Sequence, residues 1–289
     1  MAQVTAALVK QLREMTDSPM MECKKALVEA DGDIEKAVDV LRKMGVAKAV
    51  KRAGRDTNEG TVAAYVSEDG KTGALLELTC ETDFVGTNPK FIGFANDLAK
   101  VVAENNPADV DALLALPMGE DTVKDELTEM IHVIGENMKI ARFQRVTVEN
   151  GALASYIHLG GKLADITVFE FSKPETAQNE EFKTFAHDVC MQVAAIAPVS
   201  ARREDVPEDV IAHEKSIYMA QAADSGKPEF IQEKIALGKL EKFYKENVLT
   251  EQEFIKDSSM TIADLAKKVD KATEDTIQIT RFVRFAFGE

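Results

Sequence analysis

An internal repeat constrains the fold of this chain more than any other feature. The segment GTVAAYVSEDGKT at residues 60–72 recurs 91 residues later as GALASYIHLGGKL at 151–163. Identical residues continue without a gap from 88–103 to 179–194. Each copy predicts two β-strands joined by a turn that contains Gly-Lys, followed by a helix. Self-similarity of this kind indicates two related structural units built on one plan.

The two halves also end alike, but at a different spacing. The segment IARFQR at 140–145 resembles ITRFVR at 279–284. The offset has risen from 91 to 139 residues, so the second half holds 48 additional residues between its helix and its last strand. These residues fall within about 198–260 and have helical spacing on both sides of an SGKP sequence at 225–228. They predict an inserted antiparallel helical hairpin.

Apolar residues at helical spacing predict three short helices in the first 45 residues. A DSP sequence separates the first two helices, with Ser18 placed to cap the second and Pro19 at its first position. A DGD sequence separates the second from the third, which Gly45 is expected to end. We therefore expect an α+β protein with three parts. They are a helical head with a basic linker at 1–55, a core subdomain at 56–149, and a related core subdomain at 150–289 that carries the hairpin.

Composition and charge limit the partners of the chain. The net charge is −15, of which residues 1–55 contribute +3 and the remainder therefore −18. So acidic a body repels phosphate backbones, and we expect no direct nucleic-acid partner. No stretch approaches the roughly 18 apolar residues of a membrane span, and the N-terminus does not resemble a secretion signal. Three widely spaced cysteines favour a reducing, cytoplasmic location.

No catalytic or metal-binding arrangement is recognisable in the sequence. The GKT at 70–72 resembles the end of a phosphate-binding loop, but Tyr65 stands where that loop needs its first glycine. The four histidines do not have zinc-ligand spacing with the cysteines, and no G-x-S-x-G motif occurs. We therefore expect a protein that is not an enzyme, with no catalytic residue, no cofactor and no metal site.

The segment CETDFVGTNPKF at 80–91 is the most unusual local feature. It joins a strand-like run to a helix-like run, and it carries Asp83 and Phe84 where small polar residues are usual. The corresponding residues of the second copy are Pro174 and Glu175, so the shared scaffold does not by itself need the aromatic ring. Two interpretations stay open. Phe84 either packs into a local pocket at the start of the next helix, or it contacts a partner.

Met20 and Met21 are adjacent at the start of the second predicted helix. Both cannot face one narrow core stripe, so we expect one of them to be exposed. An exposed methionine suits an adaptable contact surface. The alternative is that both are partly buried within the three-helix head.

Taken together, these segments resemble the elongation factor Ts family, the guanine-nucleotide exchange factors of elongation factor Tu. The resemblance spans essentially the whole chain. It rests on LREMTDSPMMECKKAL, DGDIEKA, CETDFV, IGEN, SYIH and the final RF. It implies a head of the ubiquitin-associated type followed by two related core subdomains, in agreement with the repeat.

The resemblance also implies a function. The chain would bind elongation factor Tu with GDP and promote GDP release by disturbing the magnesium and nucleotide site, so that GTP can rebind. In the family the Asp–Phe pair reaches into the partner near its magnesium, and here those residues are Asp83 and Phe84. The residues that similarity assigns to partner contact are Thr82, Asp83, Phe84, Val85, Met20, Met21, Leu12, Ile134, Gly135, Glu136 and His158.

Two alternatives remain at this level. The chain could be an adaptor whose head recruits another protein without exchange activity, although an adaptor has no need of the TDFV segment.

The inserted hairpin has more apolar residues than a lone helix can bury. It is expected to pack within itself or on the body, and self-association with another copy is the alternative.

Overall fold

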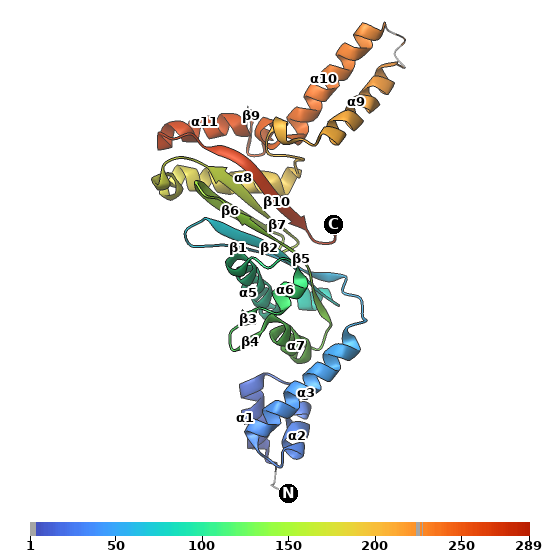
Figure 1. Cartoon of the computed structure of the whole chain (residues 1–289), viewed down its shortest axis with the longest axis vertical. Coiled ribbons are helices and arrows are strands. Elements are labelled where there is room, and N and C mark those ends of the chain that lie inside the picture. Colours follow the sequence, from blue (N-terminus) through green and yellow to red (C-terminus); the bar gives the residue numbers. More distant parts are fainter. Residues whose placement is uncertain (1–3, 224–225, 227) are drawn as a thin grey trace. The chain divides into compact units, whose positions relative to one another are not determined.

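The computed structural model describes residues 4–223, 226 and 228–289. Helices and antiparallel strands are mixed along the chain, which confirms the α+β class (Figure 1). The chain forms two compact units. The first consists of residues 1–63, 76–143 and 288, and the second of residues 64–75, 144–287 and 289. The boundaries predicted at 56 and 150 follow the repeat rather than these units, and they stay a prediction.

Three helices form the head at the N-terminal end of the first unit. They are α1 Ala6–Thr16, α2 Met20–Glu29 and α3 Ile34–Arg52. Thr5 caps α1 by accepting from Leu8 N, and Asp33 caps α3 by accepting from Lys36 N. The helices pack around one small core, which consists of Val9, Leu12, Cys23, Ala26, Leu27, Ala30, Ala37 and Leu41.

Two details of the head differ from the sequence prediction. Helix α3 continues through Gly45 to Arg52, because good helix-forming residues follow and the missing side chain lets the helix approach α7 Val123–Ile134. A Cβ on Gly45 would lie 3.3 Å from the His132 side chain. Ser18 does not cap α2. It is buried, and its hydroxyl donates to Thr16 O at 3.4 Å.

The first half of the core contains a three-stranded sheet in the order β1-β2-β5. Its strands are β1 Glu59–Val66, β2 Thr72–Cys80 and β5 Met138–Thr147. Between β2 and β5 run α4 Asp83–Gly86, α5 Pro89–Asn105, α6 Val110–Leu114, β3 Pro117–Met118, β4 Asp121–Thr122 and α7. Helix α5 buries an apolar face that includes Phe91 and Leu98, and β2 is buried along most of its length. The small strands β3 and β4 pair with each other just before α7.

The second half repeats this plan, with the sheet order β10-β7-β6. Its strands are β6 Gly151–His158, β7 Leu163–Glu170 and β10 Gln278–Ala286. The 3-10 turn η1 Pro174–Gln178 stands where α4 stands in the first half, and α8 Glu180–Ile196 stands where α5 stands. Strands β8 Glu253–Phe254 and β9 Asp257–Thr261 precede α11 Ile262–Thr273 as β3 and β4 precede α7. Edge-to-face phenylalanines pack its core: Phe169, Phe171, Phe182 and Phe185.

Helix ends extend the repeat further than the sequence comparison did. Thr122 and Thr261, 139 residues apart, cap α7 and α11 through the same bond to the third helical residue. Both helices end at a left-handed residue, Gly135 in the first half and Glu274 in the second. The offset of the closing strands therefore holds from the start of these helices onward. In each half, the last helix and the last strand form one duplicated segment.

The additional residues of the second half form two long helices, α9 Glu208–Ala223 and α10 Glu229–Asn247, which pack against each other (Figure 1). The short turns η2 Arg203–Asp205 and η3 Leu249–Glu251 flank them. The Arg203 guanidinium bonds to Glu241 and Glu251 and lies 4.2 Å from the ring centre of Tyr244. The hairpin base is thus held by charge and packing together. The predicted SGKP turn lies partly outside the described residues.

Candidate functional site

The segment Thr82–Val85 forms a short helical turn that presents an aromatic side chain to solvent. The Thr82 hydroxyl caps the turn by accepting from Val85 N at 3.4 Å. Val85 points inward and is buried, whereas Phe84 is 84% exposed. The Asp83 carboxylate accepts from Phe84 N at 2.9 Å and is itself exposed. Burial of Val85 and the cap therefore hold the turn in place while Phe84 makes no core contact.

The exposure of Phe84 argues against one of the two interpretations left open by the sequence, namely packing at the start of the next helix. A phenylalanine that packed the start of α5 would be buried, and this one is not. Exposing so large an apolar side chain is unfavourable in an isolated protein, and it is typical of a surface that binds something. The corresponding turn of the second half exposes Glu175 instead. The aromatic ring is therefore present in only one of the two corresponding turns.

A glutamate fixes the Thr82 turn to the end of α7. The Glu136 carboxylate accepts from Thr82 N at 3.0 Å and from the Thr82 hydroxyl at 2.6 Å, one bond to each oxygen. Gly135, with φ of 91°, ends α7 and turns the chain so that Glu136 can reach Thr82. We call this pair of bonds the Glu136 clamp. It brings Glu136, which similarity assigns to partner contact, into direct contact with the turn that carries Phe84.

Neighbouring residues tie the same region to the linker that follows the head. The Glu81 carboxylate accepts from Asn137 N at 2.6 Å and pairs with Arg55 at 3.3 Å. The buried Asn137 side chain donates to Arg55 O at 2.8 Å. Arg52, at the end of α3, donates to Ile131 O at 3.1 Å near the C-terminus of α7. The turn, the end of α7 and the end of α3 thus form one hydrogen-bonded region.

The head carries two exposed methionines and one buried leucine among the predicted contact residues. Met20 is 52% exposed and Met21 is 63% exposed, so both present apolar surface rather than one. Both lie in the first turn of α2, beyond the core stripe of that helix. Leu12 is 0% exposed and packs in the head core. It can therefore act on a partner only by supporting the surface above it.

The head rests on α7 through a charged, partly buried contact. His132 of α7 is buried, and its Nε2 lies 3.5 Å from Glu22 of α2. Glu22 also pairs with Lys48 of α3. Burial lowers the pKa of His132, and it does so against the opposite effect of the Glu22 carboxylate. Neither ring nitrogen of His132 has a hydrogen-bond partner among the described residues, so the neutral ring suits this position.

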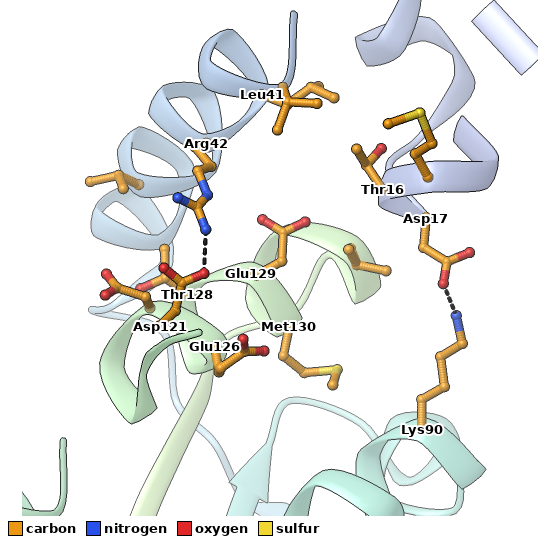
Figure 2. Close-up of a pocket in the computed structure, with 15 residues that line it drawn as sticks. Thr16, Asp17, Leu41, Arg42, Lys90, Asp121, Glu126, Thr128, Glu129 and Met130 are labelled. Atoms are coloured by element: carbon orange, nitrogen blue, oxygen red, sulfur yellow. Dashed lines mark hydrogen bonds and ion pairs between the residues drawn. The ribbon is translucent and has the colours of Figure 1, made fainter. Parts of the chain in front are cut away.

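A cavity of about 540 Å³ lies between the head and α7. Figure 2 shows the side chains that line it. It is lined by the end of α1, one face of α3 and one face of α7. Two ion pairs bridge it: Arg42 with Asp121, and Asp17 with Lys90 at 2.7 Å. Burial raises the pKa of the Glu129 carboxyl in its lining. The cavity therefore lies at the interface between the head and α7, and its ion pairs help to keep the head in position.

His158 lies in the second unit, at the end of β6. Its ring is exposed, and its Nδ1 is 3.0 Å from the Tyr156 hydroxyl. The two rings are tilted, with centres 5.8 Å apart, and the ring of Tyr156 also lies 5.5 Å from that of His187 in a T-shaped arrangement. The structure thus brings the Thr82 turn and the segment Ile134–Glu136 together in the first unit, while His158 belongs to the second.

Comparison with known proteins identifies the family. The family profile described as Elongation factor TS matches residues 81–289. A protein of Clostridium perfringens named Elongation factor Ts is 47% identical over 289 residues, which cover 99% of this chain and 93% of that protein. One of Chloroherpeton thalassium with the same name is 43% identical over 293 residues, which cover 100% of both. The chain belongs to the elongation factor Ts family.

Membership in the elongation factor Ts family gives the chain a role in translation. It is a translation elongation factor that acts in protein biosynthesis as a guanine-nucleotide exchange factor, and the family implies elongation factor Tu as its partner. No helix in the part of the chain that the structure describes is long and apolar enough to cross a membrane.

Sequence reasoning missed some residues of this elongation factor Ts site. Arg52 was assigned to the linker because Gly45 was expected to end α3, although its helical spacing would have shown that the helix continues. His132 was not singled out, because one histidine on an amphipathic helix carries no signal. The sequence did contain an indication of a structural role for Glu136, because an acidic residue recurs at Asp275, at the offset of the closing strands.

Proposed function

We propose that this chain binds elongation factor Tu in its GDP form and accelerates GDP release through the turn that carries Phe84. The observation that supports the proposal is the 84% exposure of Phe84 on a turn that is held by the buried Val85, the Thr82 cap and the Glu136 clamp. An aromatic side chain held in this way acts as a preorganised anchor, because little conformational freedom of the backbone remains to be lost on binding.

The proposed mechanism needs no covalent step. Phe84 wedges between elements of the partner near its magnesium and nucleotide site, and Asp83 brings a negative charge to the same place. The site then holds magnesium and GDP less tightly, and GTP can bind after GDP has left. The coupling is reciprocal, so GDP weakens the binding of this chain as much as the chain weakens that of GDP, typically by about 1–3 kcal/mol. The chain changes an equilibrium and its rate, and is not itself a catalyst of a chemical reaction.

The remaining contact residues would form two further areas. Met20 and Met21 offer a flexible apolar surface on the head, whose core contains Leu12. Ile134 and Gly135 border the Phe84 turn at the end of α7. His158, exposed at the end of β6, would provide a contact from the second unit.

The proposal also includes the cellular location of the protein and the absence of direct nucleic-acid binding. Elongation factor Tu takes part in protein synthesis, so the chain would act in the cytoplasm. Its three cysteines are buried and form no disulfide in the part of the chain that the structure describes, which fits a reducing compartment. The acidic body argues against direct binding to nucleic acid.

The proposal is tested by the release of fluorescently labelled GDP from elongation factor Tu. Release is followed after addition of excess unlabelled nucleotide, with and without the chain. We expect the release rate to rise with the concentration of the chain and to saturate when all of the partner is bound. Binding of the chain to elongation factor Tu without any faster release would contradict the proposal, and it would favour an adaptor instead.

A further inference from the structure

The Glu136 clamp has a counterpart in the second half of the chain. Asp275 stands 139 residues after Glu136, which is the offset of the two closing strands. Lys173 stands 91 residues after Thr82, which is the offset of the first part of the repeat. The Asp275 carboxylate accepts from Lys173 N at 2.8 Å, just as Glu136 accepts from Thr82 N at 3.0 Å. The donor and the acceptor are thus related to those of the first half by two different offsets, and they form the same bond.

Hydroxyl groups complete the clamp in both halves. Glu136 accepts from the Thr82 hydroxyl at 2.6 Å, and Asp275 accepts from the Thr176 hydroxyl at 2.8 Å and the Ser172 hydroxyl at 2.7 Å. In each half the carboxylate follows the last helix and precedes the closing strand. In each half it holds the short helical turn that follows the second strand.

The clamp occurs in both halves, whereas the exposed phenylalanine occurs in only one. The second half has the carboxylate and the turn, but Glu175 takes the place of Phe84. A bond present in both halves belongs to the common scaffold, whereas Phe84 belongs to the first half alone. Both carboxylate oxygens of Glu136 are already used by Thr82. A partner that bound this carboxylate would have to compete with those bonds.

We propose that Glu136 is a positioning residue, which acts on exchange by holding the Phe84 turn rather than by contacting the partner. This inference rests on the proposed function of Phe84. Phe84 has almost no packing of its own, so its direction is set by the backbone of the turn. Hydrogen bonds to a charged acceptor are stronger than those between neutral groups, and here two of them fix the first residue of the turn. Without them the turn samples other conformations, and a smaller fraction of the molecules presents Phe84 correctly.

The first test uses the chain alone. It contains no tryptophan, so Phe84→Trp provides a single fluorescent reporter at the tip of the turn. We expect Glu136→Ala to lower the fluorescence anisotropy of this reporter, and Glu136→Gln to restore part of it, because the amide can still accept one bond. The matched control is Asp275→Asn, which loosens only the turn of the second half and should leave the reporter unchanged. An anisotropy unaffected by Glu136→Ala would overturn the inference, whether or not the chain accelerates GDP release.

The second test asks whether Glu136 acts through Phe84. GDP release from elongation factor Tu is measured with Glu136→Ala, Phe84→Ala and the double variant. We expect Glu136→Ala to lower the stimulated rate about tenfold, Glu136→Gln to lower it less, and Glu136→Ala to have no further effect once Phe84 is removed. Equal fold losses in the presence and absence of Phe84 would mean that Glu136 contacts the partner directly, which overturns the inference. A parent chain that does not stimulate release refutes the proposed function, and the anisotropy test of the clamp still stands.

Discussion

At the scale of single residues, the direction of Phe84 follows from its neighbours. Val85, the next residue of the same turn, is buried, and Thr82 is held at its start by the cap and by the Glu136 clamp. Successive residues of a helical turn point about 100° apart, so a buried Val85 and a fixed Thr82 leave Phe84 facing solvent. The free energy that the protein gives up by exposing this ring becomes available when a partner covers it.

Met20 and Met21 are expected to contribute to partner binding without contributing to stability. Replacing both with alanine should weaken the complex with elongation factor Tu by about 1–2 kcal/mol, because partner-covered apolar surface is lost. The thermal midpoint of the free chain should change little, since both side chains are mostly exposed. Binding is measured by titration of the partner, and Val28→Ala is the control, because Val28 on α2 is 58% exposed as well. An equal loss of affinity in Val28→Ala would contradict a specific methionine surface.

His132 should make the stability of the first unit depend on pH. Burial lowers the pKa of His132, with Glu22 acting in the opposite direction and Lys48 and Arg52 in the same direction as burial. A group whose pKa is lower in the folded state adds stability above its ordinary value, about 6.5 for histidine. That stability is lost as the pH falls toward the folded value, because the unfolded chain then binds the proton more readily.

The test compares urea unfolding at pH 7.5 and pH 5.5. The chain with His132→Gln should lose less stability on acidification than the parent chain. The control is His213→Gln, because His213 is exposed on α9 and should leave the difference unchanged. If His132→Gln lost as much stability as the parent between these pH values, the buried neutral ring would not be the cause.

At the scale of secondary structure, the repeat predicted two strands, a helix and a closing strand in each half, but it did not predict the order of the strands in the two sheets. The prediction that Gly45 ends a helix was wrong. In a sequence, a glycine at a helix end looks the same as a glycine inside a helix that lies close to another helix. The exposure of Phe84 could not be predicted, because two residues on one short turn can face opposite ways with the same composition. The clamp joins residues 54 positions apart, and no local pattern specifies it.

Gly45 and Gly93 offer a matched test of close packing between helices. Both lie inside helices, but a Cβ on Gly45 would meet His132 at 3.3 Å, whereas nothing lies within 4 Å of one on Gly93. We expect Gly45→Leu to destabilise the chain by about 1–3 kcal/mol through overpacking. Gly93→Leu should be neutral or slightly stabilising, because leucine favours the helix. Free energies of unfolding from urea titrations measure both. Equal effects of the two substitutions would show that α3 does not need a close approach to α7.

At the scale of the whole molecule, the two halves of the core share one plan and differ in two features that stand out. Each half has a three-stranded sheet, a helix after its second strand, a helix before its closing strand and a carboxylate clamp. Phe84 distinguishes the first half, and the α9–α10 hairpin distinguishes the second. Differences between two copies of one scaffold are the natural place to look for function, because the common parts are already explained by folding.

The α9–α10 hairpin is expected to be an accessory to exchange. It packs mainly at its base, where Leu240 and Phe243 are buried, while Phe230 and Leu237 of α10 are largely exposed. Replacing residues 208–247 with a short Gly-Ser turn should leave stimulated GDP release within about twofold of the parent, because the first half has no such hairpin and folds on the same plan. Light scattering on the same sample reports self-association, which a fall in molar mass would reveal. Loss of exchange in a folded, monomeric deletion variant would mean that the hairpin belongs to the surface that acts on elongation factor Tu.

Release of GDP from elongation factor Tu by the parent chain, Phe84→Ala and Glu175→Ala tests the central claim most directly. The two substitutions fall at corresponding positions of the repeat, on turns that a carboxylate clamps in the same way. We predict that Phe84→Ala lowers the stimulated rate about 30-fold or more, while its thermal midpoint stays that of the parent and Glu175→Ala changes neither quantity. Undiminished exchange by Phe84→Ala, or an equal loss in Glu175→Ala, would contradict the account.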